Sequence, residues 1–301
     1  MDPIRNLVVP VDFSDPSRAA VNQAIALAKL DGASVHLVHA LTFPLVSSPY
    51  DVSVPAAIWE GVRSGASERI EALQKEVEAS GVESVTTELG ESIDPVDVIA
   101  QAAKSHDADL VVMGTHGYGG IKHAFLGSVA ERTIRTLACP VLAVKSASPD
   151  ATPPIRRILV PVDFSSHSDR AAALAAGLAT RLGASIDLLH SIDFAPESAG
   201  YLTPDAMDFG RKLQAIASER LEQITQSIPD DVETVVHLHR GKPASVIEAI
   251  AKQVGADLIV MGTHGHTGLS HLFIGSVAER TLRIAPCSVL AVKADEDTPQ
   301  S

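Results

Sequence analysis

Short apolar runs alternate with longer segments whose apolar residues recur at helical spacing. In the first half of the chain, five runs predict strands: Leu7–Val11, Val35–Leu41, Ser84–Leu89, Leu110–Met113 and Val141–Val144. The segments between them predict helices over residues 16–31, 68–79, 96–104 and 128–137, the first ending at Gly32 as a C-cap. Strands that alternate with helices predict an α/β fold with a doubly wound parallel sheet.

The second half of the chain repeats the first. Residues 107–145 and 255–293 are identical at 26 of 39 positions, and residues 4–41 and 155–192 at 18 of 38. A period of about 150 residues is too long for a solenoid repeat, so a whole domain is duplicated. We therefore predict one domain over residues 1–146, a Pro-rich linker over 147–154, a second domain over 155–294 and a polar tail over 295–301.

The chain is acidic overall. Its 301 residues include 37 Asp and Glu against 24 Lys and Arg, a formal net charge of −13. Nucleic acids and anionic membranes attract positive protein surfaces, so this balance argues against both as general partners. The sequence has two cysteines, no apolar run long enough to cross a bilayer, and no basic segment followed by a long apolar run at its start. These features predict a cytoplasmic protein.

A glycine-rich loop follows the fourth predicted strand of each copy. Gly114–Gly117 precedes Gly127-Ser128 by nine residues, and the second copy repeats this spacing with Gly262–Gly265 and Gly275-Ser276. Glycines allow a ligand to approach the backbone closely, and a helix N-terminus offers N–H groups to an anion. The serine, with a glutamate three residues later, also fits a capping box in which the serine is the N-cap. We predict an anion-binding loop, although a loop that only turns the chain stays an alternative.

This loop resembles the nucleotide-binding motif of the universal stress protein family. The segments Val9–Ser14 and Val160–Ser165, which read VPVDFS, also match that family's first strand and loop. The resemblance covers nearly the whole chain as two tandem domains. It implies a five-stranded parallel sheet of order 3-2-1-4-5 flanked by helices, and the binding of ATP. AMP or ADP stays open as the ligand, and Mg²⁺ would arrive with the phosphates.

The resemblance also implies which residues contact the nucleotide. In the first copy they are Pro10, Asp12, Ala40, Met113, Gly114, Gly117, Gly127, Ser128 and Val129. In the second copy they are Pro161, Asp163, Ser191, Met261, Gly262, Gly265, Gly275, Ser276 and Val277. The aspartates would accept hydrogen bonds from the base or the ribose. The glycines would hold the phosphates through main-chain amides.

Several catalytic motifs are absent from the sequence, among them the P-loop, a dinucleotide fingerprint after the first strand and the nucleophile elbow. We expect no catalytic residue and no dedicated metal site, and favour an ATP-binding module that regulates or protects during stress. Two alternatives stay open. One is a slow ATPase or nucleotide-transfer enzyme using His116, His264 or Lys122. The other is a nucleotide-independent scaffold that pairs through its last strands, within the chain or as a homodimer.

Overall fold

A computed structural model describes residues 3–42, 56–115, 126–145, 154–194, 203–265 and 274–293. Contacts divide the chain into two compact units. One is built mainly from Pro3–Ile121 and Gly127–Thr152, and the other mainly from Pro153–Ser301; we call them domain 1 and domain 2. In the part of the chain that is described, no helix combines the length and the apolar character needed to span a membrane.

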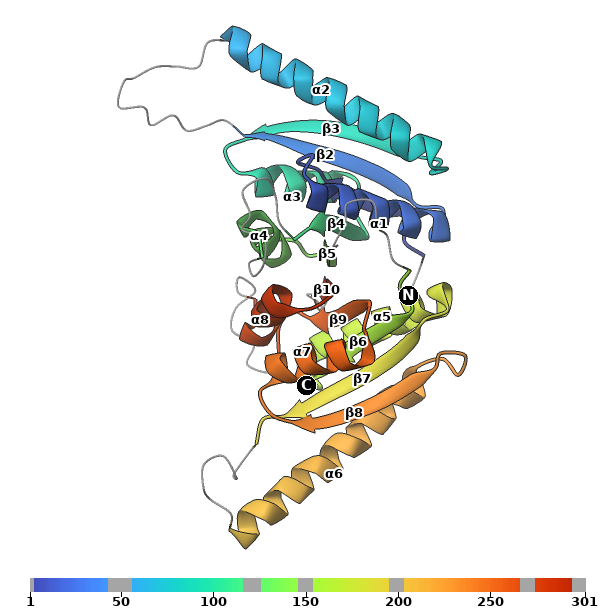
Figure 1. The fold of residues 1–301 in the computed structure, drawn as a ribbon, viewed down its shortest axis with the longest axis vertical. Helices are drawn as coiled ribbons and strands as arrows, with labels where there is room; N and C mark the ends of the chain where they lie inside the picture. Colours follow the sequence, from blue (N-terminus) through green and yellow to red (C-terminus); the bar gives the residue numbers. More distant parts are fainter. Residues whose placement is uncertain are drawn as a thin grey trace, which may run out of the picture. The chain divides into compact units, whose positions relative to one another are not determined.

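Domain 1 is a parallel sheet with helices packed on it (Figure 1). Its strands are β1 (Asn6–Pro10), β2 (Ser34–Thr42), β3 (Val85–Ser92), β4 (Leu110–Gly114) and β5 (Val141–Val144). Its helices are α1 (Asp15–Asp31), α2 (Ala56–Ala79), α3 (Pro95–Ser105) and α4 (Ser128–Thr136). The strands lie in the order β3-β2-β1-β4-β5, and each pair is parallel.

Domain 2 repeats this arrangement. Its strands are β6 (Arg157–Pro161), β7 (Ser185–Ile192), β8 (Thr234–Arg240), β9 (Leu258–Gly262) and β10 (Ser288–Val292). Its helices are α5 (Ser166–Leu182), α6 (Pro204–Ser227), α7 (Pro243–Val254) and α8 (Ser276–Ile284). The strands lie in the order β8-β7-β6-β9-β10, again parallel, so the predicted α/β class and the predicted order 3-2-1-4-5 are confirmed in both domains.

The strand order reverses direction between the first and the fourth strand of each sheet. From β1 the chain moves outward through β2 to β3, then returns to the other side of β1 with β4. Helices α1 and α2 are joined by an ion pair between Arg18 and Glu76, while α3 packs beside α4. In a doubly wound sheet, the crevice at such a reversal is the usual ligand position.

Helix ends follow local capping chemistry. Gly32 is the C-cap of α1 with φ 70°, as the sequence predicts, and Gly183 ends α5 with φ 63°. The predicted start of α2 at Glu68 is wrong, because α2 begins at Ala56. The first half of α2 has apolar residues at helical spacing, Ile58 and Val62, but both are exposed, and the buried residues of α2 lie at position 66 and beyond.

The core lies between the sheet and the helices. Leu7, Leu37, Ile158 and Leu188 are fully buried on the central strands.

A carboxylate connects the start of β4 to the start of β1. Asp109 Oδ2 accepts hydrogen bonds from the backbone N–H groups of Arg5 and Asn6 at 2.7 and 2.9 Å. These bonds join β1 and β4 at their amino ends, and the parallel pairing of the two strands places their carboxyl ends side by side, where the candidate site lies.

Candidate functional site

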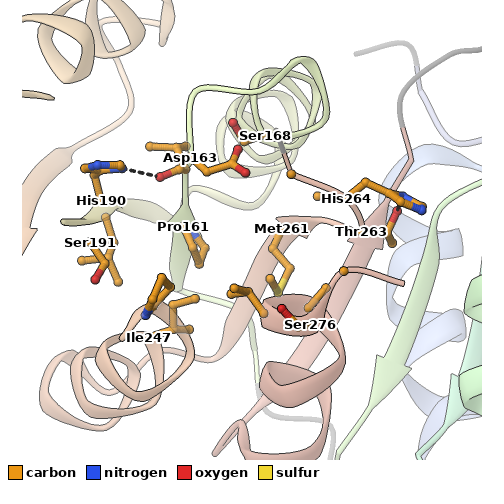
Figure 2. Close-up of a pocket in the computed structure, with 18 of the residues that line it drawn as sticks. Pro161, Asp163, Ser168, His190, Ser191, Ile247, Met261, Thr263, His264 and Ser276 are labelled. Atoms are coloured by element: carbon orange, nitrogen blue, oxygen red, sulfur yellow. Dashed lines mark hydrogen bonds between the residues drawn. The ribbon is translucent and has the colours of Figure 1, made fainter. Parts of the chain in front are cut away.

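Domain 2 contains a cavity of about 520 Å³ at the carboxyl edge of its sheet. The ends of β6, β7 and β9 line it, together with the N-terminal turns of α7 and α8 (Figure 2). This volume is typical of a small-molecule site. All nine second-copy residues that the sequence singles out line this one cavity: Pro161, Asp163, Ser191, Met261, Gly262, Gly265, Gly275, Ser276 and Val277.

The cavity has two chemically different ends. Because β7 and β9 lie on opposite sides of β6, Ser191 and Ile247 stand at one end and Thr263, His264 and Ser276 at the other (Figure 2). Met261 lies between the two ends and is 5% exposed. The first end combines apolar side chains with the Ser191 hydroxyl and the His190 ring, and the second is built from polar groups and backbone. Such an arrangement suits a ligand with an aromatic part and an anionic part.

The polar end is a helix N-terminus. The N-cap of α8 is Gly275, and its N–H donates to the carbonyl of Thr263 at 2.8 Å. The predicted capping box is therefore wrong: Ser276 is the first helical residue, and no side chain among the described residues caps α8. The same holds in α4, whose N-cap is Gly127. Without a side-chain cap, the first-turn N–H groups are available to an anion.

Two glycines bring backbone close to other atoms around the cavity. A Cβ on Gly262 would lie 2.9 Å from the Cβ of His167, the residue that follows the start of α5. A Cβ on Gly265 would lie 2.5 Å from Oδ2 of Asp163. No Cβ fits at either distance without movement, so these positions require glycine for close approach.

A tight turn after β6 holds Asp163 in place. Its Oδ1 accepts hydrogen bonds from the Ser165 N–H at 3.0 Å and from the Ser165 hydroxyl at 2.5 Å. Ser165 in turn caps α5 by accepting from the N–H of Ser168 at 3.3 Å. The carboxylate is therefore held by the first residues of a helix, and the direction of its second oxygen is set toward Gly265.

His190 lines the cavity beside Ser191, and the sequence analysis did not single it out. Its Nδ1–H donates to the carbonyl of Val162 at 2.8 Å (Figure 2). Burial lowers the pKa of His190 below its ordinary value of 6.5, against the opposing effects of this hydrogen bond and of the Asp163 charge. The neutral ring therefore predominates at neutral pH.

Ser191 lies in β7, and its side chain is hydrogen-bonded to the loop before α7. Its hydroxyl donates to the carbonyl of Gly241 at 2.7 Å, and Gly241 has φ 135°, which a glycine adopts readily. In domain 1, Ala40 holds the corresponding strand position opposite Gly90 and has no hydroxyl. The equivalent position of domain 1, two residues before the proline that begins the next helix, is the exposed Ile93 instead of a glycine.

In domain 1 the described candidate residues occupy the same carboxyl edge. Pro10 ends β1, Asp12 accepts from the N–H and the hydroxyl of Ser14, and Met113 and Gly114 end β4. Gly127, Ser128 and Val129 form the start of α4. Gly117, together with His116 and Lys122, lies outside the described residues.

Several cavity residues were missed from the sequence: Val162, Ser168, Leu189, His190, Asp193, Pro243, Ile247, Thr263 and Ala278. Four of them, Val162, His190, Thr263 and Ala278, directly adjoin residues that were found, so extending each motif by one position would have included them. Ile247 is different, because it lies one turn inside α7 and has the spacing of an ordinary core residue. Only the packing of α7 on the sheet brings it to the cavity.

Known proteins match this chain throughout its length. The family model described as Universal stress protein family matches residues 3–145 and again residues 154–293. A universal stress protein from Mycolicibacterium smegmatis is 30% identical over 294 residues, which cover 95% of this chain and 96% of the relative. One from Methanocaldococcus jannaschii is 37% identical over 142 residues, covering 47% of this chain and 82% of the relative.

Solved structures share the fold. A universal stress protein from Archaeoglobus fulgidus aligns with a TM-score of 0.69 at 22% identity, covering 97% of both chains. The chain belongs to the universal stress protein family, and it contains two family domains in tandem.

Proposed function

We propose that this protein binds an adenine nucleotide, ATP in the first place, in each of its two domains, and that it acts as a regulatory or protective module of the stress response. The observation that carries this proposal is the domain 2 cavity. It combines a wall formed by Ile247 and Met261 with the uncapped N-terminus of α8 at the other end. A purine fits against the first, and phosphates fit the second.

The ligand would be held mainly by backbone. N–H groups at the start of α8 and the glycines at 262, 265 and 275 would surround the phosphates, while the Asp163 carboxylate would accept hydrogen bonds from the sugar or the base. Backbone dipoles act locally, so the net charge of −13 does not oppose such a ligand. Mg²⁺ would bind chiefly to the phosphates, since it needs few protein ligands.

Bound nucleotide would stabilise the folded protein by mass action. A ligand at 100 times its dissociation constant adds about 2.7 kcal/mol to the free energy of unfolding. Regulation then follows from the cellular nucleotide concentration, without any catalytic step.

Mass spectrometry of nucleotide released from the purified full-length protein tests this proposal. We expect an adenine nucleotide at up to two per chain. The Gly265→Ala variant should retain no nucleotide in domain 2, because the alanine Cβ would displace the Asp163 carboxylate. Gly65→Ala is the matched control, because Gly65 has no positive φ, has open space around its Cβ position and lies in α2 of domain 1.

Equilibrium dialysis gives the contrary outcome. If neither ATP, ADP nor AMP is retained at millimolar concentration, the proposal is wrong and the nucleotide-independent scaffold gains. Light scattering with and without ATP then measures whether homodimer formation depends on nucleotide. Phosphate release that is unchanged in Gly265→Ala would place any hydrolysis outside the domain 2 site.

A further inference from the structure

An aromatic residue with an unusual backbone follows the candidate aspartate in each domain. Among the described residues, the non-glycine positions with positive φ are Phe13 at 63°, Asp107 at 46° and Phe164 at 65°. Aspartate tolerates this region because its short side chain can bond locally, whereas a bulky aromatic residue is an outlier there. Such a conformation persists only where the surroundings impose it, and it occurs most often at functional sites.

The Phe164 ring is held on two sides. The His190 ring lies at 4.3 Å between centroids and at 32° to it, and the Arg220 guanidinium lies 5.3 Å from its centroid. His190 is itself fixed through its hydrogen bond to the Val162 carbonyl. Arg220 belongs to α6, so the ring also links the long helix to the loop after β6.

The left-handed turn at Phe164 determines how Asp163 is presented. It brings the N–H and the hydroxyl of Ser165 back onto Oδ1 of Asp163. With Oδ1 engaged, Oδ2 is the oxygen that approaches Gly265 in the cavity wall. Phe164 does not line the cavity itself, so any effect on a ligand must pass through Asp163 or His190.

Domain 1 builds the same stack from its own residues. The Phe13 ring lies 4.7 Å from the His39 ring and 4.1 Å from the Arg69 guanidinium, and His39 donates to the Val11 carbonyl at 2.7 Å. Arg69 belongs to α2, in the part of the repeat whose sequence has diverged. Helices α2 and α6, whose sequences differ, thus each supply an arginine to the equivalent phenylalanine ring of their own domain.

We propose that Phe164 is a positioning residue, which holds the Asp163 carboxylate toward the cavity and couples the docking of α6 to occupancy of the site. The role of Phe13 in domain 1 is the same. This inference rests on the proposed function for its ligand, and the packing alone does not account for it. A residue that only filled space between His190 and Arg220 would not need a left-handed backbone.

A double-mutant cycle measured by titration calorimetry with ATP tests the proposal. The full-length chain carries Asp12→Ala and Ser128→Glu throughout, because the added carboxylate at the start of α4 repels phosphates, and the domain 2 site is then measured alone. Phe164→Gly still permits the left-handed turn but removes the ring contacts that hold it, so we expect it to weaken ATP binding about tenfold, the size of a lost charged hydrogen bond. Phe164→Tyr keeps the ring and should stay within about twofold of the parent.

The pairing with Asp163 separates positioning from simple packing. Asp163→Asn alone should weaken ATP at least about tenfold, and adding Phe164→Gly to it should cause no further loss, because the two residues act through one contact. Arg220→Met should weaken ATP about threefold, and Arg220→Lys less. Phe13→Gly, the same change in the other domain, should leave domain 2 affinity unchanged.

Additive losses in the double variant, or parent affinity in Phe164→Gly, would overturn the proposal. A ligand-free measurement keeps it distinct from the proposed function. In ¹³C spectra of Asp-labelled protein, the Asp163 carboxylate resonance should move in Phe164→Gly and not in Phe164→Tyr. If the parent binds no nucleotide, the proposed function fails, and an unmoved Asp163 resonance would overturn the positioning role as well.

Discussion

The two domains agree at the carboxyl edge of their sheets and differ in the middle of the second strand. At the edge, both have the aspartate, the left-handed phenylalanine and a helix that opens at a glycine N-cap. In the strand, His36 and Asp187 occupy the same register, opposite Val8 and Leu159. Both side chains are buried, yet their chemistry is opposite.

In domain 1, His36 is buried against a hydroxyl group and a second imidazole ring. Its Nδ1 lies 2.7 Å from the Thr86 hydroxyl, and its ring stacks on His106 at 3.9 Å between centroids. Burial first, and then the charge of His106, lower the pKa of His36 below its ordinary value of 6.5. His36 is therefore held in its neutral form.

Domain 2 places a charge at the same position. Asp187 is 1% exposed, and its Oδ1 accepts from Nε2 of His237 at 2.6 Å. Nε of Arg157 lies 3.1 Å from the other oxygen, in an ion pair without an aligned hydrogen bond. The same fold therefore accommodates either an uncharged histidine or an ion-paired aspartate at this buried position of the second strand, away from the candidate site. At the candidate site, the described residues of both domains share the aspartate, the left-handed phenylalanine and the glycine N-cap, and they differ at Ser191 and Ala40.

Removing the buried charge should have the largest effect. Asp187→Ala leaves His237 and Arg157 without their shared partner, and we expect domain 2 to lose about 3 kcal/mol or more. Hydrogen exchange of the β6 and β7 amides measures this loss. Asp230→Ala, an exposed change in the same domain, is the control. A loss below about 1 kcal/mol would contradict the difference we draw between the domains.

Replacing glycines that lie in close contact with other residues should cause the next largest loss of stability. A Cβ on Gly114 would lie 2.7 Å from the Pro16 carbonyl carbon, tighter than the 2.9 Å contact of Gly262 with His167. We expect Gly114→Ala to cost domain 1 about 2 kcal/mol, and Gly262→Ala to cost domain 2 less. The one tryptophan of the chain, Trp59, lies in α2 and makes fluorescence a probe of domain 1 unfolding.

The control for this series is Gly65→Ala. Gly65 is an exposed residue of α2 with open space around its Cβ position, so alanine should be neutral or stabilise by up to about 1 kcal/mol. Equal losses in Gly65→Ala and Gly114→Ala would show that the contact with Pro16 is not the cause.

A smaller effect is expected at the loop before α7. Ser191→Ala removes the hydrogen bond to Gly241 and should cost domain 2 about 1 kcal/mol, by denaturant unfolding monitored through hydrogen exchange. The reciprocal change Ala40→Ser in domain 1 should gain nothing, because Gly241 presents its carbonyl with a backbone φ of 135°, and Ile93 at the equivalent position does not have a positive φ. A gain there would mean that the two loops are interchangeable.

The smallest expected effect is a change in how the free energy of unfolding of domain 1 depends on pH. The pKa of His36 is lowered on folding, so its contribution to stability is complete above pH 6.5 and is lost as the pH falls through the folded-state pKa. Domain 1 should therefore lose stability on acidification, as measured by Trp59 fluorescence in urea. His36→Gln should flatten this dependence. An unchanged slope would show that His36 does not carry it.

Much of the fold could be predicted because its signals are local or repeated. Apolar periodicity located the strands, and Gly32 was recognisable as a C-cap from its place after an amphipathic segment. The N-caps of α4 and α8 could not be recognised, since Ser128 and Ser276 satisfy the capping pattern. The glycine before each is fixed instead by a hydrogen bond to Thr115 or Thr263. That bond depends on a strand brought alongside by the sheet.

The sequence by itself determined the duplication and the edge of the sheet where the candidate residues gather, while the strand order was implied by the resemblance to the family. The tertiary structure alone decided which atoms meet there: Oδ2 of Asp163 against Gly265, the Phe164 ring between His190 and Arg220, and Ile247 in the cavity wall. The physical reason is that periodicity and caps are properties of neighbouring residues. Contacts between residues far apart in the chain depend on how strands pair and helices pack.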